Sequence, residues 1–344
     1  MRKSIFFLLS LIMVLSCDKE VEKKVAFKLE PIFNHDMGDF HHDLWKHGQD
    51  IFFAFMNTVI VGEWHLGNFT VKDTISLPNE RGVINGIIPQ EPNNSRFIVL
   101  SSEGFWILNS SKPYYGHFRS NPYQLCSVGY TRGGAAFYGE HILVGGDEGL
   151  QYFSEDSFGK YRNDNFRGES MGHEVLCNTP IVSIVFKTIN NVLFGFALAD
   201  RDTLIVIKGF DQKELQLEKI NLMSKRFYRT DVLSDSKRNT IYIVSTDSVY
   251  TIGVEKPLEP QITKRFGVYK NTSPFQRKRL NNNFIISGSH GFSEFINVSN
   301  PNNPIMYSVK DDNRFFESVR IEWPYIFMIN ESSGFWVYKI QDIR

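Results

Sequence analysis

The chain repeatedly places a short apolar run, a polar turn ending in glycine, and a second run that opens with apolar or aromatic residues. Clear copies start at Phe97, His141, Phe284 and Ile326, with glycines at positions 104, 149, 291 and 334. Degenerate copies fill the gaps, with turns near Gly67, Asp202 and Ser248. Each copy predicts a β-hairpin, in which glycine supplies the positive φ that a tight turn requires.

The spacing of these turns predicts the fold. They lie at positions 67, 104, 149, 202, 248, 291 and 334, a mean spacing of about 44 residues. That period, with several short strands in each unit, is typical of a β-propeller. A helical solenoid would need long stretches of i, i+3, i+4 apolar spacing, and none of useful length occurs. We expect an all-β fold, a seven-bladed β-propeller of four-stranded antiparallel blades. The sequence limits the number of blades only to the range from six to eight.

The first and last segments of the chain are expected to form one blade together. The last unit ends after Ile340 without residues for an outer strand, and a short apolar segment, residues 25–33, precedes the first inner strand. We expect this N-terminal segment to pair beside residues 335–340 and close the ring, which would remove an exposed sheet edge. In the third unit, we expect the inner strand from Ser127 and the outer strand near Tyr161.

The sixth unit carries a family resemblance. It reads GFSEFINVSNPNNP from Gly291 to Pro304. This resembles the LVIVD-repeat family, whose unit is a glycine-led strand followed by a Val-Ser-Asn-Pro-x-x-Pro turn; the likeness is partial at Gly104, Gly149 and Gly334 and weak elsewhere. Where the family has Asp, Asn297 keeps a side-chain acceptor for capping the turn. The resemblance implies a β-propeller in an extracytoplasmic setting and supplies no catalytic residues.

The N-terminal residues have the pattern of an export signal. Arg2 and Lys3 precede an apolar run from Ile5 to Leu15, and Val14-Leu15-Ser16 leads directly to Cys17. This order is similar to a bacterial lipoprotein signal, in which a small residue precedes the cut and the cysteine thiol takes a diacylglycerol. An ordinary secretory signal that contains a cysteine is the alternative. A lipidated Cys17 with several acyl chains would anchor the protein stably to a membrane.

These features divide the chain into three parts: a removed signal peptide over 1–16, a lipidated Cys17 and tether over 17–24, and a single propeller domain over 25–344. Acidic residues directly after the cysteine resemble the export signal of surface lipoproteins from Bacteroidetes. We therefore expect a lipid-anchored, extracytoplasmic protein at the outer membrane or cell surface.

The net charge of the chain limits the classes of partner that we expect. Lys+Arg and Asp+Glu both number 38, and removing Arg2 and Lys3 leaves a mature net charge of −2. A nucleic-acid partner is not expected, because such proteins carry a clear basic excess. No GxSxG, GxGxxG, Walker or CxxC motif occurs, so no cofactor is expected. A protein or a glycan remains as the expected partner, beside the membrane reached through the anchor.

Four histidines gather in one acidic stretch: His35, His41, His42 and His47. Imidazoles with carboxylates suit a transition metal, yet no spacing here matches a known zinc site. A polar connection between the closing strand and the first blade is the simpler interpretation.

Arginine adjoins phenylalanine near several blade ends, at Arg119, Arg167, Arg226, Arg265 and Arg314. On loops leading to the central channel, these guanidinium groups would hold an anionic or sugar-like ligand by forked hydrogen bonds. On outer strands, the phenylalanine would be core and the arginine solvated.

Cys126 and Cys177 occupy similar contexts, which predicts matching places at the start of neighbouring inner strands. A disulfide is permitted outside the cytoplasm if the Cα atoms lie within about 7 Å, and two small buried hydrophobes are the alternative.

Aromatic residues make up 14% of the chain, and many follow a hairpin glycine: Phe105, Trp106, Phe292, Phe295, Phe335 and Trp336. We expect their rings to pack face to face between blades. The acids Glu103, Asp147, Glu148 and Glu331 fall at hairpin turns, where solvated turn residues are usual. The pattern favours a binding or interaction module; the alternative is an extracellular carbohydrate-active enzyme with acids contributed by several blades.

Overall fold

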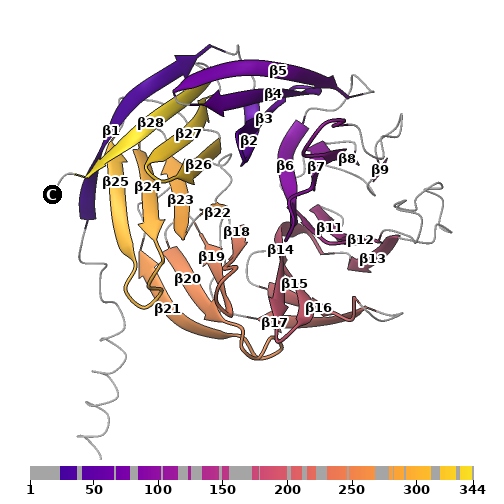
Figure 1. Cartoon of the computed structure of the whole chain (residues 1–344). Helices are drawn as coiled ribbons and strands as arrows, with labels where there is room; N and C mark the ends of the chain where they lie inside the picture. The colour runs from indigo at the N-terminus through magenta and orange to yellow at the C-terminus, as the bar shows by residue number, and fades with distance from the viewer. Residues whose placement is uncertain are drawn as a thin grey trace, which may run out of the picture.

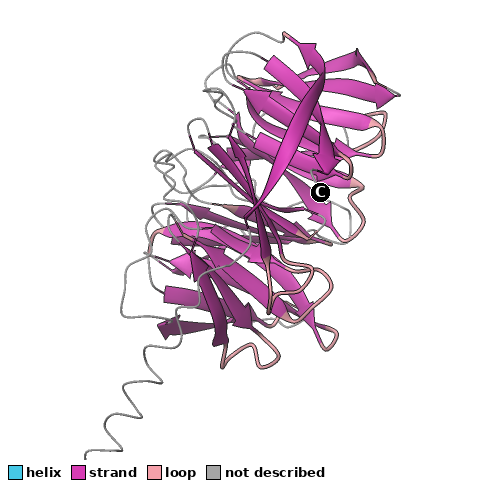
Figure 2. Cartoon of the chain, turned by 90° about the vertical axis from the view of Figure 1, so that its left-hand side faces the viewer, coloured by secondary structure: helices cyan, strands magenta, loops and turns pink. Residues whose placement is uncertain are grey.

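The computed structural model describes residues 24–36, 41–65, 67–77, 84–101, 104–114, 123–124, 134–146, 149–154, 173–177, 179–199, 203–210, 215–221, 231–245, 248–267, 279–281, 283–289, 292–310, 318–330 and 334–342. Small antiparallel sheets follow one another around a ring, a propeller-like, all-β arrangement (Figure 1). Figure 2 views the same ring from the side. Within the ranges given above, no helix is long and apolar enough to cross a membrane.

Three sheets have four strands each. The first contains β2 (His41–His47), β3 (Asp50–Phe55), β4 (Thr58–His65) and β5 (Asn68–Ser76). The second contains β14 (Ile181–Ile189), β15 (Val192–Ala199), β16 (Thr203–Lys208) and β17 (Gln216–Asn221). The third contains β18 (Asp231–Ser234), β19 (Thr240–Val244), β20 (Ser248–Gly253) and β21 (Gln261–Gly267).

Two further sheets have eight strands each. One joins β6 (Ile84–Glu91), β7 (Arg96–Ser101), β8 (Gly104–Asn109) and β9 (Tyr123–Gln124) to β10 (Ala135–Tyr138), β11 (His141–Gly146), β12 (Gly149–Ser154) and β13 (His173–Cys177). The other joins β22 (Arg279–Asn281), β23 (Phe284–Ser289), β24 (Phe292–Asn297) and β25 (Ile305–Lys310) to β1 (Lys24–His35), β26 (Ser318–Glu322), β27 (Tyr325–Asn330) and β28 (Gly334–Asp342).

The described strands thus form five hydrogen-bonded sheets: three have the expected four strands, and two differ from the expectation because each joins two groups of four. Inner strands β6 and β10 meet in parallel at Gln90–Phe137 and Glu91–Tyr138. The long strand β1 pairs in parallel with β25 over Lys24–Ala26 before it reaches β28. Each merged sheet therefore arises where one strand runs close enough to a neighbouring group to share backbone hydrogen bonds.

Strand β1 closes the ring, as the sequence predicts. It pairs antiparallel with β28 from Phe27 opposite Asp342 to His35 opposite Phe335. A register shift between Pro31 and Phe33 leaves Ile32 unpaired and 38% exposed. The closing segment is slightly longer than residues 25–33, and its placement beside residues 335–340 is confirmed.

The first hairpin differs from the prediction. Gly67 lies between β4 and β5, the third and fourth strands of its sheet, whereas Gly104 and Gly334 begin the third strand of theirs. The turn equivalent to that at Gly104 lies at Met56 and Asn57, where Met56 has a φ of 46°. The third strands of the first two groups, β4 and β8, begin at residues 58 and 104, a spacing of 46 residues. The shorter spacing of 37 residues between Gly67 and Gly104 therefore came from a misassigned turn.

The third unit also differs from the prediction. Its outer strand is β13, at residues 173–177, and not a segment near Tyr161. Cys177 therefore ends an outer strand, opposite Leu150, and does not start an inner one. Cys126, Ser127 and Tyr161 lie outside the described residues.

Aromatic residues after the hairpin glycines fill the spaces between sheets. Phe105 packs with Phe137 and Phe153 of the next group, while its neighbour Trp106 points to the opposite face and packs with Trp45 and Phe52. Successive strand residues face opposite sides, so one aromatic pair serves two interfaces. Phe295, Phe335 and Trp336 lie in equivalent clusters, and the side chain of Phe292 is outside the described part.

Face-to-face stacking occurs within one sheet, where Phe335 lies 6.3 Å from Phe327 at an interplanar angle of 9°, but two contacts between neighbouring groups of strands are edge-on. Phe105 meets Phe153 with centroids 5.0 Å apart and an interplanar angle of 81°. Phe53 meets Phe335 at 5.0 Å and 71°. Edge-on contact brings the positive rim of one ring against the negative face of another, which the aromatic quadrupole favours.

The turn of the sixth unit is capped as predicted. Asn297 Oδ1 accepts the backbone N–H of Ser299 at 2.9 Å, and Asn300 Oδ1 accepts that of Asn302 at 3.1 Å. Two consecutive side-chain-capped turns therefore form this proline-flanked loop.

We predict that Phe33→Ala weakens ring closure. The Phe33 ring lies 5.3 Å from Trp64 and 6.1 Å from both Phe69 and Phe335. Its loss should lower the free energy of unfolding by about 1–3 kcal/mol, measured by urea denaturation. The neighbouring Ile32→Ala is the control and should change it by less than about 0.5 kcal/mol. Equal effects of both substitutions would contradict a closing role for the Phe33 ring.

Candidate functional site

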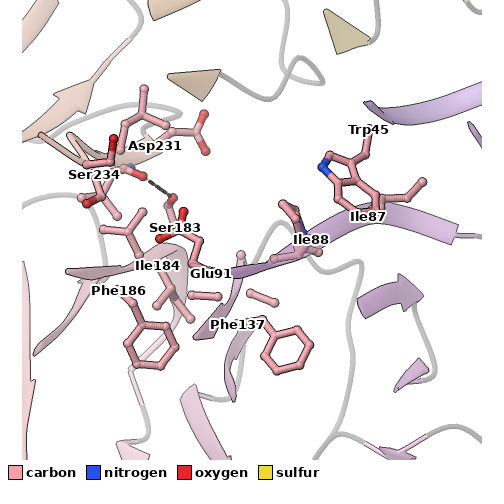
Figure 3. A pocket seen from close by; sticks show the side chains of 18 of the residues that line it. Trp45, Ile87, Ile88, Glu91, Phe137, Ser183, Ile184, Phe186, Asp231 and Ser234 are labelled. Carbon is pink, nitrogen blue, oxygen red and sulfur yellow. Dashed lines mark hydrogen bonds between the residues drawn. The ribbon is translucent and has the colours of Figure 1, made fainter. Parts of the chain in front are cut away.

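A cavity of about 580 Å³ opens where the inner strands converge. Its lining comes from six of them, β2, β6, β10, β14, β18 and β26. Figure 3 shows Trp45, Ile87 and Ile88 facing Ser183, Ile184, Asp231 and Ser234 across it. A site built from so many sheets exists only in the assembled ring.

Asp43, near the start of β2, hydrogen-bonds to two other inner strands, β6 and β26. The residue is 1% exposed. Oδ2 accepts the N–H of Ile87 on β6 at 2.9 Å, and Oδ1 accepts the hydroxyl of Ser318 on β26 at 2.7 Å and the N–H of Leu44 at 2.9 Å. One buried carboxylate thereby links strands from both neighbouring groups, with charge-assisted hydrogen bonds.

The same relation recurs further round the ring. Ser183 Oγ on β14 accepts the N–H of Val232 on β18 at 3.1 Å. Gly134, just before β10, lies so close to β14 that a Cβ would be 3.0 Å from the backbone N of Ile184. A short polar side chain or glycine at the start of one inner strand therefore contacts the backbone of the next.

The C-terminal ends of the inner strands carry charge. Lys46 on β2 pairs with Glu322 on β26 at 2.8 Å, and its ammonium lies 5.4 Å from the centre of the Phe327 ring. Lys187 on β14 donates to the carbonyl of Asp235, just after β18. Residues near the start of one inner strand thus contact the early part of a neighbouring inner strand, and residues near its end contact the end of a neighbour. These inner strands therefore run in the same direction along the cavity.

Burial alters the acid–base behaviour of two facing groups. Glu91 borders the cavity and is reached by solvent, but the surrounding protein raises the pKa of its carboxyl, against a smaller lowering by the charge of Lys187. Burial lowers the pKa of Lys187, opposed by the charges of Asp235 and Glu91. Desolvation favours the neutral form of each, and mutual attraction opposes it.

Arg320 has no carboxylate partner among the residues that the structure describes. It lines the cavity and is 6% exposed. Its polar contact among the described residues is Nη1 to the carbonyl of Val319, on its own strand, at 3.1 Å. A guanidinium has five N–H donors, so this contact leaves most of its hydrogen-bonding capacity available.

The predicted arginine site is not assembled in the described part. Arg265 lies exposed on the outer strand β21, where it donates to Ser248 Oγ at 3.1 Å and lies over the Tyr250 ring. The adjacent Phe266 is buried, as the solvated interpretation expects. Arg119, Arg167, Arg226 and Arg314 lie outside the described residues.

Of the four predicted histidines, the two with described side chains contact aromatic rings. His35 lies 5.3 Å from the Phe69 ring, and His47 stacks on Trp45 at 5.3 Å. The side chains of His41 and His42 are outside the described part. Across the described residues, no three His, Cys, Asp or Glu side chains gather as a metal would require.

Other predicted positions lie outside the described part. Cys17 precedes it, and the turn acids Glu103, Asp147, Glu148 and Glu331 fall in its gaps.

The predictions from sequence missed the charged residues of the cavity: Lys46, Glu91, Asp231, Arg320 and Glu322. A signal for them exists in β26, where the polar Ser318, Arg320 and Glu322 alternate with the apolar Val319 and Ile321. A polar face on a strand that opens a propeller unit indicates the ring axis. The repeat was recognised from the hairpin turns, and these turns do not include the inner-strand positions that form this polar face.

Comparisons with known proteins support the fold. Neither family models nor curated protein sequences give a match. Among solved structures, the chain is similar to the β-propeller domain of Cps50 (Swd1) from Myceliophteria thermophila, with a TM-score of 0.65 and 9% identity over 91% of this chain and 100% of that one. Together with the sheet arrangement, this likeness defines the class of the fold as a β-propeller.

We predict that Asp43→Ala loosens the ring. The substitution leaves the N–H of Ile87 and the hydroxyl of Ser318 without this acceptor. Unfolding free energy should fall by about 2–4 kcal/mol in urea titrations, and by less in Asp43→Asn, which keeps one acceptor oxygen. The control Asp73→Ala, at a solvated ion pair with Lys112, should cost at most about 1 kcal/mol. A loss no larger than that of the control would refute the role of Asp43.

Proposed function

We propose that this protein is a lipid-anchored binding module of the outer membrane or cell surface, with its ligand held in the cavity at the ring axis. The observation that carries the binding function is the cavity itself, which six inner strands line and to which five of them contribute charged or hydroxyl groups. Its volume falls in the range of small-molecule sites, and mixed apolar and convergent polar lining is typical of them.

An exposed tryptophan that lies on half-buried aromatic rings supports contact with a larger partner, a protein or a glycan. Trp323, in the turn between β26 and β27, is 53% exposed and stacks on Phe284 with centroids 6.2 Å apart. Tyr307 lies 6.3 Å from the same Phe284 ring. Exposed aromatic side chains provide the rigid, amphipathic area that interfaces use.

We also propose seven blades of the LVIVD-repeat type. The 28 strands of the described part divide into seven sets of four when β1 is counted with β26, β27 and β28. The capped turn at Asn297 supports the repeat type.

A carbohydrate-active enzyme is the second candidate. The cavity contains carboxylates from three inner strands, Glu91, Asp231 and Glu322. Burial raises the pKa of Glu91, which favours the protonated form that a general acid needs.

The binding function is tested by filling the cavity. Ser234, at the end of β18, lines it, and Ser234→Trp would place an indole there. A panel of sugars, amino acids and short peptides is screened by thermal shift and calorimetry. We expect at least one compound to bind the wild type and to lose at least about tenfold in affinity with Ser234→Trp.

The control is Ser76→Trp, at the exposed end of outer strand β5, which should bind as the wild type does. Absence of binding to the wild type, or equal binding by Ser234→Trp, would refute the cavity as the site. Product analysis of the same mixtures separates the two candidates, because cleavage of a panel sugar would identify an enzyme.

The anchor is tested at Cys17. We predict that Cys17→Ser abolishes incorporation of a labelled fatty acid and moves the protein from the membrane pellet to the soluble fraction, because the acyl chains supply the membrane affinity. Cys177→Ser is the matched control and should stay labelled and membrane-bound. Labelling of the Cys17→Ser protein equal to that of the wild type would rule out the lipoprotein assignment.

A further inference from the structure

Arg320 is held in place by the residues on either side of it. Ser318, Arg320 and Glu322 occupy alternate positions of β26 and so share one face of the strand. Ser318 is fastened to Asp43 and Glu322 to Lys46, both on β2. The guanidinium therefore lies between two fixed contacts and borders the cavity.

Two acids held against β26 or on it, Asp43 and Glu322, form their contacts with groups other than Arg320. Glu322 forms an ion pair with Lys46 at 2.8 Å, and Asp43 accepts hydrogen bonds from three donors. No ion pair to Arg320 forms within the described residues, although the residue is only 6% exposed. A buried guanidinium is costly unless an anion accompanies it, and its planar fork fits a carboxylate.

The other polar groups that line the cavity suit hydroxyls. Ser234, Ser236 and Asn94 are uncharged groups that both donate and accept, and the carboxylates of Glu91 and Asp231 accept. Apolar walls from Ile87, Ile88 and Phe137 suit the carbon face of a ring. A ligand with one anionic end and several hydroxyls would satisfy both regions.

We propose that the axial cavity binds an acidic sugar, a hexuronate, whose carboxylate forms a forked hydrogen bond with Arg320. This inference rests on the proposed binding function and names its ligand class. Two sources would present the same chemistry, a free hexuronic acid and the uronate unit of a short oligosaccharide.

The test measures affinity by calorimetry for D-glucuronate, a uronate disaccharide, D-glucose, L-glutamate and sulfate. We expect at least one uronate to bind the wild type about 10- to 100-fold more tightly than glucose, as loss of a charge-assisted fork predicts. Glutamate and sulfate should bind more weakly than the uronate. Preference for the monosaccharide or the disaccharide identifies the source.

Variants locate the carboxylate. Arg320→Gln should lose the preference for uronate over glucose, and Arg320→Lys, which keeps the charge without the fork, should retain part of it. Arg265→Gln on the exposed outer strand is the matched control and should bind as the wild type does. If Arg320→Gln does not fold, the comparison of glucuronate with glucose on the wild type still decides the proposal.

The outcomes distinguish this inference from the function on which it rests. If some other panel compound binds, is blocked by Ser234→Trp and shows no preference for uronate, the cavity is a binding site and the acidic-sugar proposal is wrong. Tighter binding of glutamate would assign a zwitterionic ligand and also overturn it. If no compound is blocked by Ser234→Trp, the binding function itself fails.

Discussion

Pairing of the two ends of the chain is the constraint on which the ring depends. Strand β1 hydrogen-bonds to β28 from Phe27–Asp342 to His35–Phe335, so the paired residues lie 300 to 315 positions apart in the sequence. Without β1, β28 would present an unpaired edge, and the cluster of Phe53, Trp64 and Phe335 would lose Phe33 from its surface. Closure fixes the positions of β2 and β26, and thereby the contacts between them at the axis.

The axis has two chemically different ends. At the starts of the inner strands, Asp43 and Ser183 bond to backbone groups of neighbouring strands and hold the ring together. At their ends, Lys46, Glu91 and Glu322 supply charge around the cavity. Since all of these residues lie on the first strand of a unit, the structural contacts and the candidate site share the same elements. Arg320 lies between the two regions, which is why its charge is both buried and directed to the cavity.

The sequence supports much of the fold and little of the candidate site. Hairpin periodicity, the closing strand and the capped turn at Asn297 are local patterns, and the structure contains all three. Errors arose where two turns look alike: Gly67 has a positive φ of 88° like a hairpin glycine, but it joins a different strand pair. The merging of sheets through β1 and β10 depends on how close neighbouring strands come, which no local pattern records.

The sequence by itself determined an all-β chain of repeated hairpins, with aromatic residues reserved for the spaces between them, because alternation and turn chemistry act over a few residues. It also supplied the pattern from which the lipid anchor at Cys17 is proposed. Only the tertiary structure decided which side chains meet at the axis. Asp43 and Ser318, or Lys46 and Glu322, are distant in the chain and come together only when the ring closes. The choice of Arg320 over the exposed Arg265 likewise depends on burial, a property of the assembled ring.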